Sequence, residues 1–583
     1  MTLLPNDIHH GPTNRFAIEI DETKYRQKGE DFHGKCSRIA KALGDTDSHQ
    51  EKFLDILLNQ RFLPAGRVQN AMGAVRQTTA YNCFVSQPIE DSMESVMSAA
   101  TAASETMRKG GGIGYDFSLL RPRGDLIKSL DSRSSGPISF MGIFDAVCQT
   151  ISSSGHRRGA QMGVMSIEHP DIMEFITCKH NSTSLQGFNI SVGVTENFMY
   201  HLDNDIPFDL KFQGKVYETV DPKLLWDTIM RSTWDWAEPG VLFLDAINDD
   251  NNLAYCEDIA ATNPCGEQPL PPFGACLLGS FNLTKYIYQE MDSGFIIKVN
   301  KFDWKAFERD IPEVVRAMDN VIDNTIYPLP EQEREAKDKR RMGLGITGLA
   351  NAGEMIGKAY GTQEFIDFTK KILEMLRDTC YDTSADLAVE KGVFPKWHRN
   401  EYMNRPFILR LPDVLQEKMW QTGMRNSHLT SIAPTGTISI TADNVSSGIE
   451  PPFSLSYDRT YRTFEGDRVE TVIDYAYTKG TTGRTANEIT AQEHLDVLCA
   501  ASRLVDSAVS KTCNVGDDVT FEDFKDLYRD AWRRGCKGIT TFRAAGKRYG
   551  ILNETPAAAP SVATQEAAEA CYIDPATGQR SCE

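Results

Sequence analysis

The sequence lacks long apolar stretches, and no run approaches the roughly 18–20 residues that a helix needs to span a bilayer. Its first ten residues also lack the charged start and apolar core of a secretory signal peptide, so we expect neither export nor a membrane partner. Basic side chains are outnumbered as well, because the net charge is −19 and no Lys/Arg stripe is present. An acidic chain repels a polyanion, which argues against nucleic acid as a partner.

Closely spaced cysteine pairs are absent too. Thirteen cysteines are scattered over the chain, and neither C-x-x-C nor C-x-x-H occurs. Structural zinc sites usually need such a pair, so we expect no metal site, and a metal-binding or structural role for the cysteines is disfavoured. The odd number and the scatter argue against a disulfide framework and predict a cytoplasmic protein.

The length of the chain predicts either more than one hydrophobic core or a core larger than that of an ordinary domain. At 583 residues the chain has either two or more domains or one unusually large barrel. Residues 1–80 are predicted to be mainly helical, and residues 81–550 mix short strands, such as Phe208–Phe212, with amphipathic helices, such as 304–322. Thr490 and Glu493 form a capping-box pattern ahead of another helix. Residues 551–583 are rich in Ala and Pro and predict a flexible tail.

One short segment carries most of the chemical information. Asn263, Cys265 and Glu267 place an amide, a thiol and a carboxylate at alternate positions, and Pro264 and Gly266 between them predict a loop. An exposed polar turn is the alternative interpretation. It is weakened by two further thiols, Cys276 eleven residues after Cys265 and Cys83 far upstream. A thiol between an amide and a carboxylate, with two more thiols available, indicates radical or redox chemistry on a hydroxylated substrate.

The sequence around Cys265, Asn-Pro-Cys-Gly-Glu-Gln-Pro-Leu, resembles the catalytic chain of ribonucleotide reductase, in particular its adenosylcobalamin-dependent class II. The resemblance assigns Cys265 to the thiyl radical that abstracts the 3′ hydrogen and Glu267 to the general base on the 3′ hydroxyl. Asn263 would hydrogen-bond the ribose hydroxyls. Cys83 and Cys276 would reduce the 2′ position and end as a disulfide, which requires Cα atoms within about 4.4–6.8 Å.

The same resemblance implies a fold and a set of substrate contacts. The fold would be a ten-stranded α/β barrel of two parallel half-sheets, with the Cys265 loop inside. The segment Ala-Pro-Thr-Gly-Thr-Ile-Ser reads by itself as a generic turn, but it matches the family's diphosphate-binding segment. The substrate would therefore contact Arg67, Asn82, Gly111, Pro264, Gly266, Pro434, Thr435, Gly436, Thr437 and Ile438.

Regulation and re-reduction also follow from the resemblance. Asp91 and Ser92 match the start of the specificity site for dNTP or ATP effectors, which in relatives lies at a homodimer interface. Lys128 would contact effector phosphate. Arg157 and Arg158, flanked by glycines, match the loop between effector and substrate, although a solvated turn is the alternative.

Two cysteines in the tail suggest how the active-site disulfide is reopened. Cys571 and Cys582 match the family's C-terminal redox shuttle, with incidental cysteines as the alternative. A flexible tether would raise the effective concentration of their thiols. The final electron donor would be a thioredoxin- or glutaredoxin-type reductant.

Two absences distinguish the classes of this family. The chain has no Tyr-Tyr pair, and Phe542 stands in the region where class I enzymes carry it; an Arg-x-Cys-Gly-Tyr setting for a glycyl radical is also missing. Class II, with adenosylcobalamin as the radical source, is therefore the prediction. The alternative is a class I-type large subunit that needs a radical-generating partner. An inactive regulatory relative is disfavoured, because the full set of chemical residues is present.

Overall fold

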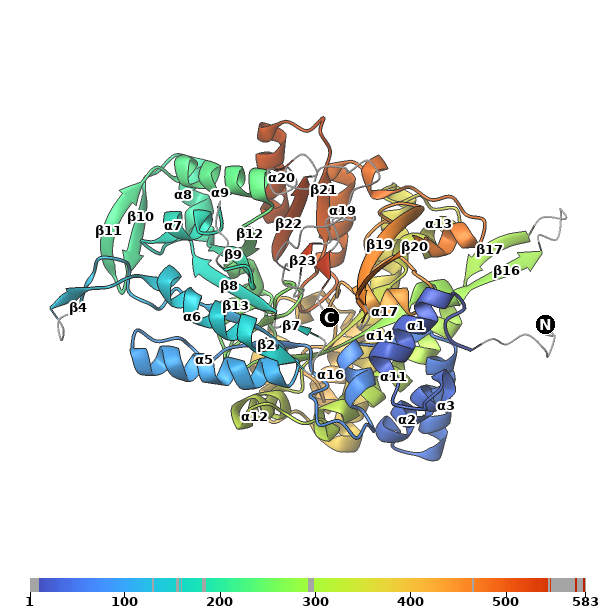
Figure 1. Ribbon diagram of the computed structural model, residues 1–583. Helices are drawn as coiled ribbons and strands as arrows, with labels where there is room; N and C mark the ends of the chain where they lie inside the picture. The colour runs from blue at the N-terminus through green and yellow to red at the C-terminus, as the bar shows by residue number, and fades with distance from the viewer. Residues whose placement is uncertain are drawn as a thin grey trace.

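The computed structural model describes residues 10–127, 131–153, 157–158, 160–180, 185–291, 298–463, 466–543, 546, 572–573 and 580–581. Figure 1 shows the chain from its N-terminal helices in blue to the red segments near the C-terminus. Within these ranges, no helix combines the length and apolarity needed to cross a bilayer. The predicted tail with Cys571 and Cys582 lies outside the described residues, apart from two short strands.

Short helices form the N-terminal part of the structure: α1 (Arg15–Tyr25), α2 (Phe32–Leu43), α3 (Asp47–Leu58) and α4 (Gly66–Ala71). The first three begin at Asn14, Asp31 and Thr46, whose side chains each accept a backbone N–H of the first turn. Strand β1 (Phe62–Pro64) then pairs antiparallel with β15 and attaches this part to the main sheet.

The first half-sheet consists of parallel strands: β2 (Cys83–Val85), β3 (Gly112–Asp116), β8 (Gln161–Ser166), β9 (Phe188–Val194) and β12 (Gly240–Phe243). The helices between them are α5 (Met93–Arg108), α6 (Pro137–Thr150), α7 (Ile172–Thr177), α8 (Glu196–Asn204) and α9 (Pro222–Trp236). These strands are almost entirely buried, as expected for a parallel sheet covered by helices.

The second half-sheet runs β15 (Ala275–Asn282), β18 (Met342–Thr347), the segment 430–432, β21 (Thr512–Val515) and β22 (Gly538–Arg543). Its neighbours are again parallel, with Leu344 bridging to Thr430 and Ile432 to Val509. The two half-sheets meet at two antiparallel seams, β2 with β15 and β12 with β22. The hydrogen-bonded circuit therefore closes, and the predicted ten-stranded α/β barrel of two parallel half-sheets is confirmed.

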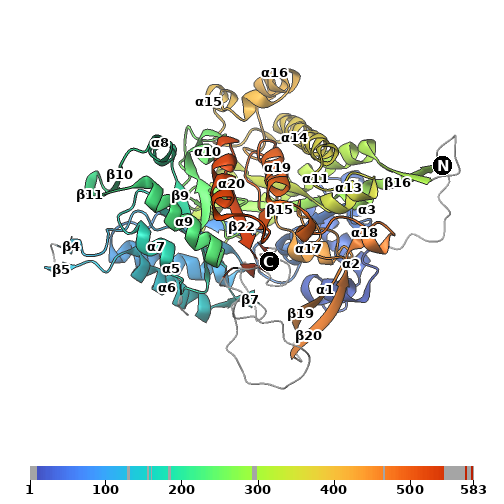
Figure 2. The ribbon, with the colours of Figure 1, turned by 90° about the horizontal axis from the view of Figure 1, so that it is seen from above.

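The helices that accompany the second half-sheet are α11 (Trp304–Asn324), α12 (Pro330–Lys339), α13 (Leu349–Met355), α14 (Gln363–Lys391), α16 (Asp413–Thr422), α19 (Ala491–Ser502) and α20 (Phe521–Arg533). Seen from above, α11, α13 and α14 lie on the other side of the molecule from α5, α6 and α7 (Figure 2). The predicted helix over 304–322 is α11, and Thr490 and Glu493 form the expected capping box of α19.

The remaining elements are mostly hairpins and short helices. They are β4 (Leu126–Ile127), β5 (Ser132–Arg133), β6 (Ser152–Ser153), β7 (Arg157–Arg158), β10 (Phe208–Phe212), β11 (Lys215–Val220), β16 (Ile287–Met291), β17 (Lys298–Phe302), β19 (Ser456–Thr463), β20 (Gly466–Ile473), β23 (Tyr572–Ile573), β24 (Arg580–Ser581), α10 (Leu244–Asp249), α15 (Arg399–Met403), α17 (Gly436–Ile440), α18 (Tyr475–Thr478) and the 3₁₀ turns Leu283–Tyr286, Ile408–Arg410 and Ala486–Glu488.

A small hairpin, β13 (Ala261–Thr262) and β14 (Pro269–Leu270), presents the loop 263–268 to the barrel interior. It lies against β3 and β8 of the first half-sheet. A Cβ on Gly114 of β3 would come within 1.8 Å of the Thr262 carbonyl oxygen. On the other half-sheet, a Cβ on Gly343 of β18 would come within 2.4 Å of the Gln268 side-chain nitrogen. Glycines on both half-sheets thus make room for the loop.

Replacing Gly114 by alanine is expected to destabilise the fold, because the Thr262 carbonyl is main chain and cannot rotate away. Overpacking of this kind typically costs about 1–3 kcal/mol, so the urea midpoint of unfolding should fall. Gly142→Ala is the control, since Gly142 lies in α6 with open space around its Cβ position and alanine favours a helix. An unchanged midpoint for Gly114→Ala would contradict the close packing of the hairpin.

Candidate active site

The barrel interior brings the predicted thiol, amide and carboxylate groups together. Cys83 lies on β2 and Cys276 on β15, while Asn263 and Glu267 come from the inner loop. The Asn263 Nδ2–H donates to Cys83 Sγ over 3.2 Å, and the Cys83 thiol donates to Glu267 Oε1 over 3.8 Å. All four side chains are buried. Residues nearly two hundred positions apart therefore form one site that bulk water does not reach.

Cys83 and Cys276 face each other directly across the antiparallel seam between the half-sheets. Directly opposite residues in such a pair have Cα atoms about 4.5–5.5 Å apart, which is within the range that a disulfide needs. Both are free thiols in this structure. The geometry therefore allows this pair to form a disulfide without moving the strands apart.

Hydrogen bonds fix the inner loop at both ends. Asn263 and Gln268 close it, with Asn263 N donating to Gln268 O at 3.0 Å and Gln268 N donating to Asn263 Oδ1 at 2.9 Å. The Glu267 carbonyl accepts from Ala508 N at 3.0 Å and from the Ser431 hydroxyl at 3.0 Å. The loop is thus held by the second half-sheet, and its functional side chains are preorganised.

Pro264 and Gly266, the two spacer residues of the motif, also have structural roles. Gly266 has φ of 81°, a left-handed conformation that favours glycine. The Pro264 carbonyl accepts from Asn189 Nδ2 on β9 at 3.1 Å. Together they carry the chain around Cys265 and tie the loop to the first half-sheet.

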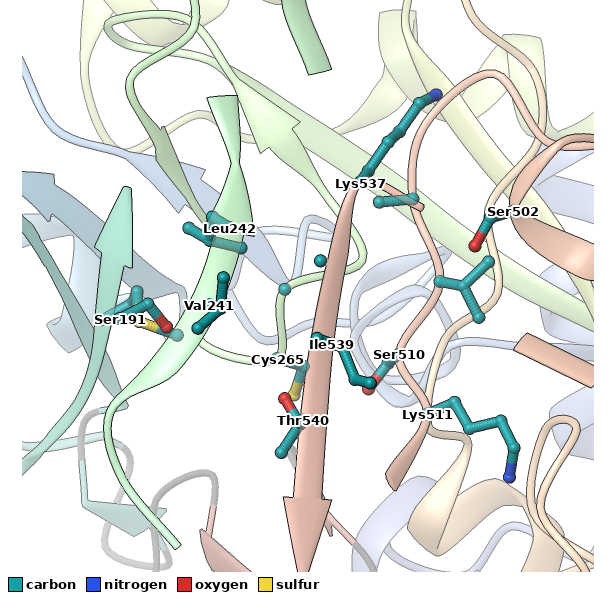
Figure 3. A pocket seen from close by; sticks show the side chains of 15 residues that line it. Ser191, Val241, Leu242, Cys265, Ser502, Ser510, Lys511, Lys537, Ile539 and Thr540 are labelled. Carbon is teal, nitrogen blue, oxygen red and sulfur yellow. The ribbon is translucent and has the colours of Figure 1, made fainter. Parts of the chain in front are cut away.

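Cys265 lines a cavity between β12 and β22 (Figure 3). Its side chain lies beside Ile539 and Thr540 of β22, and Ser191 and Ser510 add hydroxyl groups to the lining. The predicted disulfide between Cys83 and Cys276, which would form during turnover, stays a prediction, and the two thiols face each other across the seam.

Burial sets the protonation of the facing pair. It raises the pKa of Cys83 well above its usual value, and the neighbouring Glu267 carboxylate raises it further. Burial likewise raises the pKa of Cys276, but the charge of Arg341 acts in the opposite direction. Cys83 is therefore held as a protonated thiol that can give a proton or a hydrogen atom, and the two sulfurs have different electrostatic surroundings.

The predicted phosphate segment forms a compact turn. Thr435 is in the left-handed region with φ of 57°, and its hydroxyl accepts from Gly448 N at 2.7 Å and contacts the Thr347 hydroxyl at 2.9 Å. Gly436 begins α17, and Ile438 packs into a small apolar cluster. Strand β24 near the C-terminus lies against α17. The Thr435 hydroxyl is thus used by the fold, which the sequence did not indicate.

Among the predicted substrate contacts, two polar atoms are available to bind a ligand. The Thr437 hydroxyl and the Asn82 side-chain carbonyl are buried, and neither has a hydrogen-bond partner among the described residues. Buried polar groups are normally paired, so such atoms mark a place where a polar ligand can bind.

The other predicted substrate contacts have packing roles. The guanidinium of Arg67 lies over Gly110, where a Cβ would come within 2.4 Å of it. A Cβ on Gly111 would come within 2.5 Å of the Phe84 ring. Gly111 is therefore required by its close contact with a buried ring, and Gly110 by its φ of 98°, whatever the ligand.

The predicted effector residues Asp91 and Ser92 lie immediately before the first turn of α5. Asp91 pairs with Arg121 at 2.7 Å, and Ser92 caps α5 by accepting from Ser95 N at 3.2 Å. Lys128 lies outside the described residues. Arg157 and Arg158 form β7, and only their backbone is described. Asp91 and Ser92 thus have structural partners, and the effector site stays a prediction.

Several residues of the site were not expected from the sequence. Ser431 and Ala508 hold the loop, and Arg341 lies next to Cys276. Gln268 is fully buried, and its side-chain amide has no partner in the described part of the chain. Of these residues, only Gln268 could have been identified from the sequence, because it directly follows the motif.

The fold and the site define a barrel enzyme with a thiol-based redox centre. The chain belongs to the ribonucleotide reductases, because the family model "Ribonucleotide reductase, barrel domain" matches residues 81–542. It is 35% identical over 533 residues to a vitamin B12-dependent ribonucleoside-diphosphate reductase of Thermoplasma acidophilum, an alignment that covers 86% of this chain and 66% of that protein.

Other relatives bear related names. A vitamin B12-dependent ribonucleoside-diphosphate reductase of Mycobacterium tuberculosis is 34% identical over 89% of this chain and 75% of its own length. A ribonucleoside-diphosphate reductase subunit alpha of Chlamydia pneumoniae is 24% identical over 71% of this chain and 45% of its own length.

The electrostatic link between Cys83 and Glu267 predicts how the thiol titrates. In Glu267→Gln the carboxylate charge is removed, so the pKa of Cys83 should fall and its alkylation by iodoacetamide should start at lower pH than in wild type. The rate would be followed for each peptide by mass spectrometry after reduction. Cys256, which is exposed and remote from Glu267, serves as the internal control. An identical pH profile for Cys83 in both proteins would refute the link.

Proposed function

We propose that this chain reduces ribonucleotides to 2′-deoxyribonucleotides through a thiyl radical at Cys265, with adenosylcobalamin as the radical source. The observation that carries the proposal is the grouping of Asn263, Glu267, Cys83 and Cys276 in the buried interior beside the Cys265 loop. Shielding from water suits radical chemistry, because a thiyl radical is quenched by side reactions in an open site.

Each residue of the site has a proposed task. Cys265, as a thiyl radical, would abstract the 3′ hydrogen of the ribose. Glu267 would take the proton of the 3′ hydroxyl, and Asn263 would orient the hydroxyls. Cys83 and Cys276 would together supply two hydrogens, so that the 2′ hydroxyl leaves as water and the two sulfurs join in a disulfide. One ribonucleotide and one dithiol thus give one deoxyribonucleotide, one disulfide and one water.

The cavity beside Cys265 has a mixed lining, in which apolar side chains such as Val241 and Ile539 stand beside the hydroxyls of Ser191, Ser510 and Thr540. Adenosylcobalamin supplies, when bound, a carbon-centred radical by homolysis of its cobalt–carbon bond. The names of the relatives from Thermoplasma and Mycobacterium support this cofactor.

The class I alternative is disfavoured by the residue that stands where class I enzymes carry a radical-relaying tyrosine pair. Phe542 lies on β22, the strand that borders the cavity, and a phenylalanine has no hydroxyl to carry a radical. No tyrosine pair occurs elsewhere in the sequence. A separate radical-generating subunit therefore has no evident relay into this site.

The substrate is proposed to be a ribonucleoside diphosphate, in line with the names of the same relatives. Thr437 and Asn82 offer it buried oxygens that have no hydrogen-bond partner in the part of the chain that the structure describes. The other proposed contacts are Arg67, Gly111, Pro264, Gly266, Pro434, Thr435, Gly436 and Ile438.

The proposed regulation and assembly follow the family pattern. The site for dNTP or ATP effectors would use Asp91, Ser92, Lys128, Arg157 and Arg158 at the interface of a cytoplasmic homodimer. Exposed Met93 and Met97 on one face of α5 support an interface there. The proposed domains are residues 1–80, the barrel 81–550 and a redox tail 551–583.

The tail would work as a shuttle to the active site. Cys571 and Cys582 would pass electrons from a thioredoxin- or glutaredoxin-type reductant to the Cys83–Cys276 disulfide. The contact between β24 and α17, at the edge of the proposed substrate site, supports such a path.

The function is tested by deoxyribonucleotide formation from CDP and from CTP, with mixed effectors, with and without adenosylcobalamin. Dithiothreitol is included to reduce the Cys83–Cys276 disulfide that the proposed reaction leaves. Product from CDP only when the cobalamin is present is the expected result. Product that requires an added metal-bearing subunit would favour the class I alternative, and product from CTP alone would correct the phosphate level.

A further inference from the structure

A fully buried arginine faces one of the two pair cysteines. Strands β15 and β18 run parallel with Leu277 opposite Met342, so the residues just before them, Cys276 and Arg341, lie side by side across the ladder. Paired residues in neighbouring strands point to the same face of a sheet. The Arg341 side chain is 1% exposed, although a buried charge is costly unless it is paired.

Arg341 belongs to a cluster of four ionisable groups. It pairs with Glu257 and, at 3.2 Å, with Glu335. Lys339 reaches the same two carboxylates at 2.7 and 2.9 Å. Burial raises the pKa of Glu335, so this carboxylate is the one that most readily takes up a proton.

The two sulfurs of the pair therefore have opposite neighbours. Cys83 faces the Glu267 carboxylate, which disfavours a thiolate at that sulfur. Cys276 faces Arg341, whose charge favours a thiolate. The Glu267 carboxylate raises the pKa of both thiols, whereas the charge of Arg341 lowers that of Cys276. Arg341 therefore distinguishes the two sulfurs.

Other groups around Cys276 do not reverse this contrast. The Asp506 carboxylate also faces it, but accepts from Leu429 N at 2.7 Å, Thr430 N at 3.0 Å and the Tyr381 hydroxyl at 2.8 Å. Burial raises the pKa of Asp506 and keeps the Tyr81 hydroxyl protonated. His428, next to the cluster, has its pKa lowered by burial and stays neutral.

We propose that Arg341 makes Cys276 the departing sulfur when a dithiol reduces the Cys83–Cys276 disulfide, so that the incoming thiolate attacks Cys83. This rests on the proposed function, in which that disulfide forms at each turnover. Arg341 is a positioning residue for charge, since it touches neither substrate nor cofactor.

The exchange balances without any further reactant. A thiolate of the dithiol attacks Cys83 Sγ, the bond between the two cysteine sulfurs breaks, and its electron pair goes to Cys276 as a thiolate facing Arg341. The second thiol of the reductant then displaces Cys83 and closes the reductant's own disulfide. The two protons of the reductant end on Cys83 and Cys276. A sulfur whose thiolate is stabilised departs faster, which fixes the direction of attack.

The direct test traps the first step in the wild-type protein. The chain is oxidised with diamide, exposed briefly to the monothiol 2-mercaptoethanol, and quenched with iodoacetamide for peptide mass spectrometry. The expected product has 2-mercaptoethanol on Cys83 and the alkyl group on Cys276. The reverse distribution would overturn the proposal without any substitution, and the assay needs neither substrate nor cobalamin. Failure here is thus distinct from failure of the proposed function, which only the product assay reports.

A charge-balanced variant tests the role of Arg341 itself. Arg341→Met with Glu335→Gln removes one charge of each sign, and reduction of the pair by dithiothreitol should become roughly three- to tenfold slower at neutral pH. Arg341→Lys keeps the charge and should restore most of the rate.

The matched control is Arg340→Met with Asp323→Asn. It disrupts the ion pair of the neighbouring buried arginine with the half-exposed Asp323, joined at 2.8 Å, and should leave the rate unchanged. Equal slowing in both double variants would reduce Arg341 to a purely structural role. If the first double variant does not fold, the trapping result and Arg341→Lys still decide the question.

Discussion

The structure depends on one constraint: a polar loop must sit in the middle of a closed barrel and be held there without freedom to move. Asn263 and Glu267 would be costly to bury alone. They are tolerated because the loop closes on itself through Gln268 and is bonded to both half-sheets, by Asn189 on one side and by Ser431 and Ala508 on the other. The glycines of β3 and β18 leave the space that the loop fills. Fold and site are therefore one arrangement.

The antiparallel seam between the half-sheets has a second consequence. It makes Cys83 and Cys276, which are carried by different half-sheets, direct neighbours. The inner loop places Glu267 against Cys83, while the ladder between β15 and β18 places Arg341 beside Cys276. The two thiols thus have different electrostatic surroundings, which would suit the proposed pair that first gives up hydrogens and is then reopened from one side.

Much of this could be predicted from the sequence, since the chemical residues stand in recognisable motifs. The loop around Cys265, the barrel and the capped helix after Thr490 follow from local patterns and family resemblance. What could not be predicted arises from contacts between distant segments. Nothing local marks Arg341 as a neighbour of Cys276 or Ser431 as a support for Glu267, and Thr435 looked like a phosphate ligand although its hydroxyl bonds Gly448.

The central claim is that Cys265 carries the radical, and one substitution tests it most directly. Cys265→Ala would be compared with wild type for deoxyribonucleotide formation in the presence of adenosylcobalamin, effectors and dithiothreitol, with the unfolding midpoint measured in parallel. The account predicts loss of all turnover with a midpoint near that of wild type, because alanine fits the space of the buried side chain. Turnover that persists in Cys265→Ala would contradict it.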